Sequence, residues 1–200
     1  MAVSVILAHP RPDSFNHALA AVAAGAVASL GQSVFFHDLY TEGFAPLLSA
    51  AELSREATLA PPLARHCREA ATVDGFVIVH PNWWGMPPAI LAGWVDRVLR
   101  PGVAYEFLEG DNGEGVPRGL LAARTAVVLN TSDTAPEREA RIFGDPLERI
   151  WKDCVFGLCG VSDVRRRVFT TVVTSTPAER LAWLAEVETL IAAAFGPAMV

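Results

Sequence analysis

The sequence predicts an α/β protein, with one domain over residues 1–200 in which a five-stranded parallel sheet lies between two layers of helices. Short apolar runs alternate with longer helical patterns, and such alternation builds a parallel sheet covered on both faces. The length of 200 residues suits one well-cored domain, and the sequence shows no repeat or linker. The expected strands are 2–8, 33–38, 74–80, 124–130 and 164–173, and the expected helices are 15–30, 61–72, 88–99, 146–158 and 178–195.

The chain opens with the apolar strand 2–8, then a polar loop, then the helical stripe of 15–30. Such a junction points backbone N–H groups and the positive end of the helix dipole into the loop, which suits a phosphate. Ser14 and Asn16 add side-chain donors, although Ser14 alone would equally be an ordinary N-cap. The loop lacks the glycine pattern of dinucleotide-binding folds and the Gly-Lys-Ser/Thr of nucleoside triphosphatases, so both classes are excluded.

Local signals place the second strand and the last helix. Gly31 ends the first helix before the apolar residues of strand 33–38 begin. Ser49-Ala50-Ala51-Glu52 carries the capping-box pattern and predicts a short extra helix in the loop that follows. Thr176-Pro177-Ala178-Glu179 combines an N-cap, a first-turn proline and a capping-box glutamate, and therefore starts helix 178–195.

The third strand, 74–80, ends in a loop with two adjacent tryptophans, Trp83 and Trp84, and with prolines on both sides. Each indole carries a large apolar area and one N–H donor, and the prolines stiffen the backbone around them. Because open α/β sheets bind ligands at the carboxyl ends of their strands, this loop predicts a platform for a flat ligand. The alternative is that the two indoles only cap the core or a subunit interface.

Several ordered motifs carry a resemblance to a known family. They are His9-Pro-x-x-x-Ser14-Phe15-Asn16, Asp38-Leu39-Tyr40, Pro81-x-Trp83-Trp84-x-x-Pro87 and Ile90-Leu91-Ala92-Gly93-Trp94-Val95-Asp96-Arg97-Val98. Together they resemble the flavodoxin-like NAD(P)H:quinone oxidoreductase family, which also contains ancillary flavoproteins of potassium-efflux systems. The similarity runs from the first strand to about Val161.

The resemblance implies a three-layer flavodoxin-like fold with strand order 2-1-3-4-5 and a ligand crevice between the first and third strands. It implies a flavin, FMN with FAD as the alternative, and NADPH or NADH as electron donor. The first loop would hold the flavin phosphate, the tryptophan loop would lie along the isoalloxazine, and the loop after the fourth strand would face the ring's carbonyls and nitrogens. The implied cofactor-binding residues are His9, Ser14, Phe15, Asn16, Pro81, Asn82, Trp83, Trp84, Gly85, Asn130, Thr131 and Ser132.

The chain departs from the family after the fourth strand. There the family has a tyrosine and a histidine that assist hydride and proton transfer, whereas this chain has Phe143 at the histidine's place and no tyrosine between Asn130 and Pro146. The catalytic residues are therefore not assigned. Glu137 or a water is the candidate proton donor, and Phe143 forms an apolar wall over the flavin or packs in the core. With Trp84, these two residues are the candidates for the substrate pocket.

Composition excludes other classes of partner. A formal net charge of −6 argues against nucleic acid and against anionic membranes, since either would need a basic face. The uncharged stretch 16–36 is interrupted by glycines and small polar residues, so no membrane span is expected, and no secretory signal precedes the first strand; the cytoplasm is the expected location. Cys67, Cys154 and Cys159 have no zinc-type spacing and are expected to be buried thiols in a reducing compartment.

Neither a metal site nor a role for the basic cluster is expected. The acidic tract 109–115 lacks the ligand spacing of a calcium loop and is interpreted as a solvated turn. His66 and Glu69 are helix neighbours without a second pair to complete a site. The basic cluster 165–167 alternates faces on its strand, and we expect it to neutralise nearby acids or to contact a partner subunit; it is given no functional role.

We therefore expect a flavin-dependent NAD(P)H oxidoreductase that passes two electrons by hydride transfer through the flavin to a quinone or similar flat acceptor. The resemblance leaves one alternative, a flavin-binding regulatory subunit of a potassium-efflux system, which the absent tyrosine and histidine keep open. A pure electron carrier ranks last, because such carriers have a denser acidic surface. The resemblance also implies a homodimer, with the Trp94 helix and residues 100–120 as candidate contacts.

Overall fold

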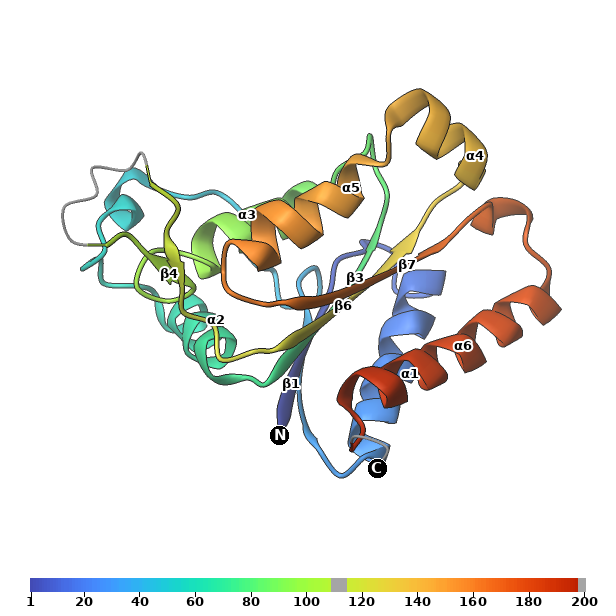
Figure 1. Cartoon of the computed structure of the whole chain (residues 1–200), viewed down its shortest axis with the longest axis horizontal. Coiled ribbons are helices and arrows are strands. Elements are labelled where there is room, and N and C mark those ends of the chain that lie inside the picture. Colours follow the sequence, from blue (N-terminus) through green and yellow to red (C-terminus); the bar gives the residue numbers. More distant parts are fainter. Residues whose placement is uncertain (109–114, 198–200) are drawn as a thin grey trace.

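The computed structural model of the chain describes residues 1–108 and 115–197. Its centre is a five-stranded parallel sheet with the order β2-β1-β3-β6-β7 (Figure 1). When these five strands are numbered along the chain, the order is the expected 2-1-3-4-5, so the predicted fold class is confirmed. The strands are β1 Ala2–Leu7, β2 Ser33–Asp38, β3 Gly75–Pro81, β6 Thr125–Thr131 and β7 Asp163–Phe169.

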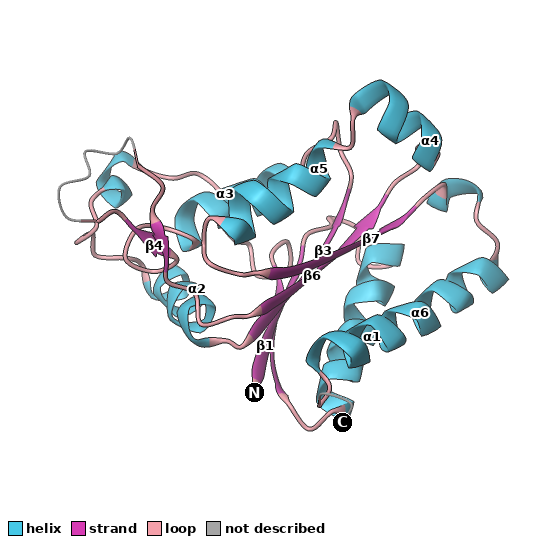
Figure 2. Cartoon of the chain, viewed as in Figure 1, coloured by secondary structure: helices cyan, strands magenta, loops and turns pink. Residues whose placement is uncertain are grey.

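Helices cover both faces of the sheet (Figure 2). On one face, α1 (Phe15–Ser29) and α6 (Pro177–Phe195) pack over a core that includes Val5, Val77 and Val127. The alternate residues of the same strands, such as Ile6 and Ile78, point into a second core on the opposite face. That face is covered by α2 Pro61–Thr72, α3 Ala89–Val98 and α5 Pro146–Arg149, and α5 continues as the π-helix η3 Ile150–Gly157.

Short elements fill the connections. The predicted extra helix is the 3-10 turn η1, Ala50–Leu53, and its capping box is present. The sequence did not predict the antiparallel ribbon, in which β4 Tyr105–Glu106 pairs with β5 Arg118–Gly119, nor the helical turns that follow β6. These turns are α4 Pro136–Arg138 and the π-helix η2 Glu139–Phe143, and the 3-10 turn η4 is Val172–Thr174.

The fifth strand is shorter than predicted. The expected strand 164–173 ends at Phe169, opposite Thr131, the last residue of β6. Thr171 then takes a left-handed conformation with φ of 54°, and η4 follows. The β-branched residues after Phe169 favour an extended chain, but no neighbouring strand remains there to pair with them. The prediction of strand for residues 170–173 is therefore wrong.

Two of the three cysteines are buried. Cys67 and Cys159 are buried as expected, and burial raises the pKa of the Cys159 thiol to about 11. Cys154 is exposed, so the expectation of a buried thiol is wrong for that residue, which lies on η3. Across the described ranges, each helix is too short or too polar to cross a bilayer. Of the predicted solvated turn, residues 109–114 lie outside the described residues.

Candidate functional site

Three loops meet at the carboxyl end of the sheet, after β1, β3 and β6, and they surround a cavity of about 510 Å³ that we call the loop cavity. The sequence predicted that ligand-facing residues would gather at this edge of the sheet. The turn after β7 and the start of α6 complete the wall. The lining residues are His9, Arg11, Phe15, Asn16, Pro81, Asn82, Trp83, Thr131, Ser132, Asp133, Thr134, Val172, Val173 and Arg180.

The first loop is held by a chain of polar contacts that runs from α1 to β2. Ser14 is the N-cap of α1, and its Oγ lies 2.9 Å from Nδ1 of His17. His17 Nε2 lies 3.2 Å from the carboxylate of Asp38. Burial opposes ionisation of Asp38, but hydrogen bonds from Thr41 and His17 outweigh it and lower the pKa of this carboxyl group. Asp38 therefore remains an anion that fixes the His17 ring and, through it, the start of α1.

Asn16 ties the first loop to the third. Its amide nitrogen donates to Thr131 Oγ1 at 2.9 Å, and both side chains are buried. Thr131 in turn pairs with Pro81 across the sheet, and its carbonyl oxygen accepts a hydrogen bond from the Asn82 N–H at 2.7 Å. One side of the loop cavity is therefore built from three strand ends that are hydrogen-bonded to one another. Such a wall needs little rearrangement to accept a ligand.

The tryptophan loop is a tight turn. Trp83 and Met86 exchange two backbone hydrogen bonds, at 3.2 and 2.9 Å, and the two residues between them have positive φ, 58° at Trp84 and 71° at Gly85. Asn82 Oδ1 accepts from the Gly85 N–H at 3.0 Å and holds the turn closed. The left-handed conformation is costly for a tryptophan. It turns the Trp84 ring into solvent, where 96% of the residue is exposed, while Trp83 lines the loop cavity.

A second cavity, of about 610 Å³, lies on the other side of this turn, and we call it the Trp84 cavity. It adjoins the loop cavity because Asn82 and Thr134 line both. The Asn82 amide donates to Glu139 Oε1 at 3.1 Å and so joins the tryptophan loop to η2. The lining residues are Asn82, Trp84, Gly85, Thr134, Glu139, Ile142, Phe143 and Pro146.

Most of the predicted cofactor residues line one of these cavities, and two are placed elsewhere. Ser14 is buried beneath the first loop, where its hydroxyl faces His17. Asn130 is fully buried within the sheet and contacts His80. Of the substrate-pocket candidates, Trp84 and Phe143 line the Trp84 cavity, whereas Glu137 is exposed on α4 and the lining carboxylate is Glu139.

Sequence reasoning named none of Arg11, Asp133, Thr134, Val172, Val173 and Arg180 as a site residue, although the first three lie in the loops that it predicted to face the ligand. Arg180 comes from the first turn of α6, where its guanidinium donates to Ser175 Oγ at 2.8 Å and to the Val172 carbonyl at 3.0 Å. The capping-box pattern located this helix start, but no motif showed that it lies beside the first loop. Arg11 and Arg180 bring two guanidinium groups to the loop cavity, although Arg11 pairs with Asp13 at 3.0 Å and the Asp133 carboxylate also lines the cavity.

A separate cluster of potential metal ligands lies at the end of β2, where one ligand-type atom each from His37, Glu42 and His66 lies within 4.8 Å of the others. Glu42 faces both rings, at 2.9 and 3.0 Å, and Glu69 faces His37 Nε2 at 2.6 Å. Sequence spacing showed only the pair His66 and Glu69. The Trp94 indole donates to His66 Nδ1 at 3.2 Å, and burial lowers the His66 pKa.

The hydrogen bond from Trp94 to His66 indicates whether this cluster suits a metal ion. Because an indole N–H only donates, a neutral His66 carries its proton on Nε2, the nitrogen that faces Glu42. A metal-binding histidine would need that nitrogen unprotonated and would give its other N–H to an acceptor. The group therefore suits a hydrogen-bonded network that joins α2 and α3 to the end of β2 better than it suits a metal ion.

A parallel sheet of this order, with ligand-facing loops beside the β1–β3 switch, defines a flavodoxin-like protein. The chain matches the Flavodoxin_2 family, described as a flavodoxin-like fold, over residues 1–190. A curated relative from Haemophilus influenzae, named "Uncharacterized NAD(P)H oxidoreductase", is 31% identical over 169 residues, covering 82% of this chain and 81% of the relative. The chain belongs to the flavodoxin-like NAD(P)H:quinone oxidoreductase family.

Solved structures share the fold at lower identity. The NAD(P)H:quinone oxidoreductase from Methanothermobacter marburgensis superposes with a TM-score of 0.81 at 23% identity, over 96% of this chain and 95% of the other. An FMN-dependent NADH-azoreductase from Bacillus anthracis, solved in complex with FMN, superposes with a TM-score of 0.76 at 16% identity, over 96% and 99%. At these identities the superpositions show the common fold.

Proposed function

We propose that this chain is a flavin-dependent NAD(P)H oxidoreductase that passes two electrons to a quinone or similar flat acceptor by hydride transfer through the flavin. The observation that carries the proposal is the pair of cavities that adjoin at Asn82 and Thr134. One has polar loops and two arginines, and the other has aromatic and aliphatic walls. A cofactor with an anionic tail and a flat ring suits the first cavity, and a second flat molecule suits the other.

FMN fits the residues of the loop cavity. Its phosphate would lie near the start of α1, where free backbone N–H groups favour an anion, and within reach of the positive charge of Arg11 and Arg180. The polar edge of the ring would meet the hydroxyl and amide groups of residues 131–134, and Trp83 would flank its apolar face. The FMN-bound azoreductase of the same fold supports FMN over the alternative FAD.

When bound, the flavin supplies the redox chemistry, since it accepts hydride from NADPH or NADH and returns it to the acceptor. The residues of the chain bind, orient and shield the reacting groups. Trp84 and Phe143 form the two exposed apolar walls between which a flat acceptor would insert. Glu139 is the titratable side chain among the described residues that line the Trp84 cavity, and its carboxyl group would exchange the proton that accompanies reduction. Glu137, exposed two residues away, is the less direct candidate.

The test follows the absorbance spectrum of the purified protein after addition of FMN, then NADPH, then 1,4-benzoquinone. Bound flavin that bleaches with NADPH and recovers with the quinone supports the proposed enzyme. Flavin that binds and stays oxidised would instead favour the regulatory subunit of a potassium-efflux system. Absence of flavin binding would contradict both functions.

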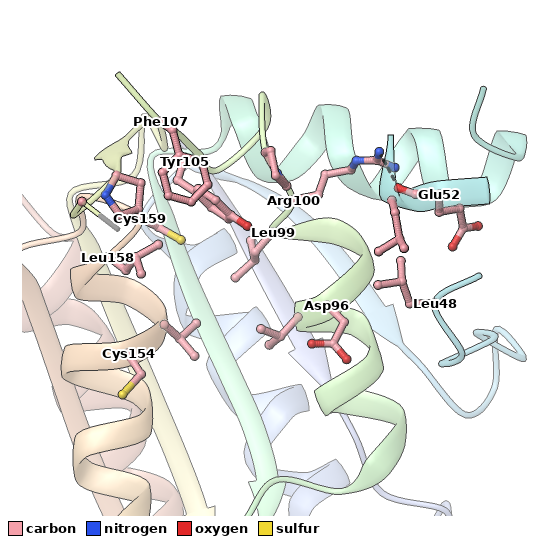
Figure 3. A pocket seen from close by; sticks show the side chains of 16 residues that line it. Leu48, Glu52, Asp96, Leu99, Arg100, Tyr105, Phe107, Cys154, Leu158 and Cys159 are labelled. Atoms are coloured by element: carbon pink, nitrogen blue, oxygen red, sulfur yellow. Dashed lines mark hydrogen bonds between the residues drawn. The ribbon is translucent and has the colours of Figure 1, made fainter. Parts of the chain in front are cut away.

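We also propose that the active form is a homodimer. A third hollow, of about 610 Å³, runs between α3, η3 and the β4–β5 ribbon, in the region expected from the sequence to form a subunit contact (Figure 3). Its rim carries exposed apolar side chains, with 69% of Leu53 and 43% of Phe107 accessible. A second copy of the chain would cover these apolar side chains, and symmetric dimers are the commonest assembly.

Sedimentation or light scattering at several concentrations measures the oligomeric state. We expect the wild type to be a dimer and the double variant Leu53→Glu with Phe107→Glu to be a monomer, because two buried carboxylates would oppose association. A matched change outside the groove, Leu181→Glu on α6, should leave the dimer intact, since Leu181 is also exposed but lies on the opposite face of the sheet. A monomeric wild type would contradict the proposal.

A further inference from the structure

Arg166 is a buried cation to which the proposed function gives no role. It lies on β7, and its side chain is only 3% exposed. Its neighbours on the strand have local partners, because Arg165 pairs with Asp163 at 2.8 Å and Arg167 pairs with Glu186 of α6 at 2.6 Å. These pairs confirm that the basic cluster neutralises nearby acids. Arg166 points to the other face of the sheet, beneath α5 and η3, and contacts residues of two other segments, Asn130 on β6 and Asp145 before α5.

The first set of contacts leads to the base of the tryptophan loop. Arg166 Nε donates to Asn130 Oδ1 at 2.6 Å, and the Asn130 amide nitrogen lies 2.8 Å from His80 Nε2. The Trp151 indole also reaches His80 Nε2, at 2.9 Å. Because an indole only donates, His80 Nε2 is an acceptor, and the ring proton lies on Nδ1. That proton is donated to the Pro81 carbonyl at 2.8 Å.

The direction of every bond in this set is thereby fixed, from Arg166 through Asn130 and His80 to the Pro81 carbonyl. Each of the three side chains is buried, so a broken link would leave a donor or acceptor without water to replace it. Burial lowers the pKa of His80 to about 4, which keeps the ring neutral and the direction of the bonds unchanged at neutral pH. Pro81 is the last residue of β3 and lines the loop cavity.

The second set of contacts leads to the segment that faces the tip of the same loop. Arg166 Nη1 donates to Asp145 Oδ2 at 2.7 Å and to Glu148 Oε2 at 3.1 Å. Asp145 has φ of 44°, a left-handed conformation that is costly without a holding contact. Pro146 follows and packs on Gly85, so closely that a Cβ on Gly85 would come within 2.7 Å of the proline Cγ.

We propose that Arg166 is a positioning residue that sets the separation of the Trp84 and Phe143 walls and thereby selects the acceptor by its width. The inference rests on the proposed function. One guanidinium holds both the base of the tryptophan loop and the corner at Asp145, and the two walls extend from these two supports. Arg166 itself does not line the Trp84 cavity, so it acts through the backbone that it holds.

An arginine is needed for this role because its fork of N–H groups can point at two supports at once. Lysine keeps the positive charge, but its single nitrogen on a flexible stem cannot reproduce the fixed geometry in which Nε faces Asn130 and Nη1 faces Asp145. Arg166→Lys therefore separates the positioning role from simple charge neutralisation. Arg165→Lys is the matched control, because Arg165 is the preceding residue on the same strand and pairs only locally with Asp163 among the contacts described above.

The experiment measures three quantities in wild type, Arg166→Lys and Arg165→Lys. They are the Kd for FMN, the amide hydrogen exchange of residues 139–149, and the ratio of kcat/KM for the narrow acceptor 1,4-benzoquinone to that for the wider 9,10-phenanthrenequinone. For Arg166→Lys we expect FMN affinity within about twofold, faster exchange of residues 139–149, and a ratio shifted by about fivefold or more towards the wide acceptor. For Arg165→Lys we expect no change in any of the three.

An unchanged ratio in Arg166→Lys, or the same change in Arg165→Lys, would overturn the proposal. If Arg166→Lys does not fold, Asp145→Asn removes the negative charge from one contact of the second set and leaves the first set in place, and it should shift exchange and ratio in the same direction by a smaller factor. A wild type that binds no FMN would contradict the proposed function instead. In that case the exchange measurement still decides whether Arg166 holds the segment 139–149.

Discussion

Burial of His80 makes the stability of the fold depend on pH in a way that a single variant can isolate. The ring is fully buried, and its pKa falls from the ordinary 6.5 to about 4 because the folded chain strips water from it. Below about pH 6.5, His80 is therefore protonated in the unfolded chain but remains neutral in the folded chain. The contribution of His80 to stability is complete above this pH and is lost progressively as the pH falls towards 4.

The size of the effect follows from the two pKa values. Linkage between 6.5 and about 4 gives a loss of about 2 kcal/mol between pH 7.5 and pH 5 and about 3 kcal/mol at pH 4. His66 and His9 also have lowered pKa values and add to the pH dependence of the wild type. The quantity to compare is therefore the difference between the wild type and a variant that cannot titrate at position 80.

His80→Gln is that variant, because its amide can accept from Trp151 and Asn130 and donate to the Pro81 carbonyl without taking up a proton. Equilibrium urea unfolding at pH 7.5 and pH 5 gives the free energy of unfolding of both proteins. We expect the wild type to lose about 2 kcal/mol more than His80→Gln over this interval. Equal losses, within about 0.5 kcal/mol, would show that His80 is not held neutral by the fold and would refute the reasoning.

Three further outcomes test the site and the fold. Arg180→Met should weaken FMN binding about tenfold in fluorescence titrations and leave riboflavin, which has no phosphate, unaffected; equal losses would contradict a phosphate role. Trp84→Gly, which suits the positive φ of 58°, should bind FMN normally and lose turnover with benzoquinone, and retained turnover would remove Trp84 from the acceptor site. Gly93→Ala should destabilise the fold by about 1–3 kcal/mol, because its Cβ would lie 2.1 Å from the Pro46 carbonyl oxygen. Gly25→Ala on α1 is the control and should not destabilise the fold, since the space around Gly25 is open. Chemical denaturation measures the free energy of unfolding of both variants.

Local signals in the sequence predicted the elements and the loops. The capping box of α6 is present, with the Glu179 N–H donating to Thr176 Oγ1 at 3.2 Å and the Thr176 N–H donating to Glu179 Oε2 at 2.7 Å. Such a signal needs only four consecutive residues, so it can be recognised in the sequence before the fold is known. The loops after β1, β3 and β6 could be predicted for the same reason, since each is marked by residues next to a strand end.

Contacts between distant parts of the chain were not predictable in this way. Asn130 was expected to contact the cofactor because it ends the fourth strand, but its side chain faces the core and meets His80, 50 residues away, and Arg166, 36 residues away. The sequence cannot show which face a strand-end side chain takes until the covering helix is placed. The turn at Asp145 has the same difficulty, because its left-handed conformation depends on a guanidinium from another strand.

Residues late in the sequence support and enclose the loop cavity. Arg166 lies on β7, and Val172, Val173 and Arg180 lie between the end of β7 and the first turn of α6. The loops that these residues support or enclose follow the earlier strands β1, β3 and β6. On a ribosome, the earlier strands emerge first and can collapse together while their loops still lack these partners. We therefore expect the loop cavity to be complete only after residues 166–180 have been synthesised, so that ligand binding there would report the arrival of this segment.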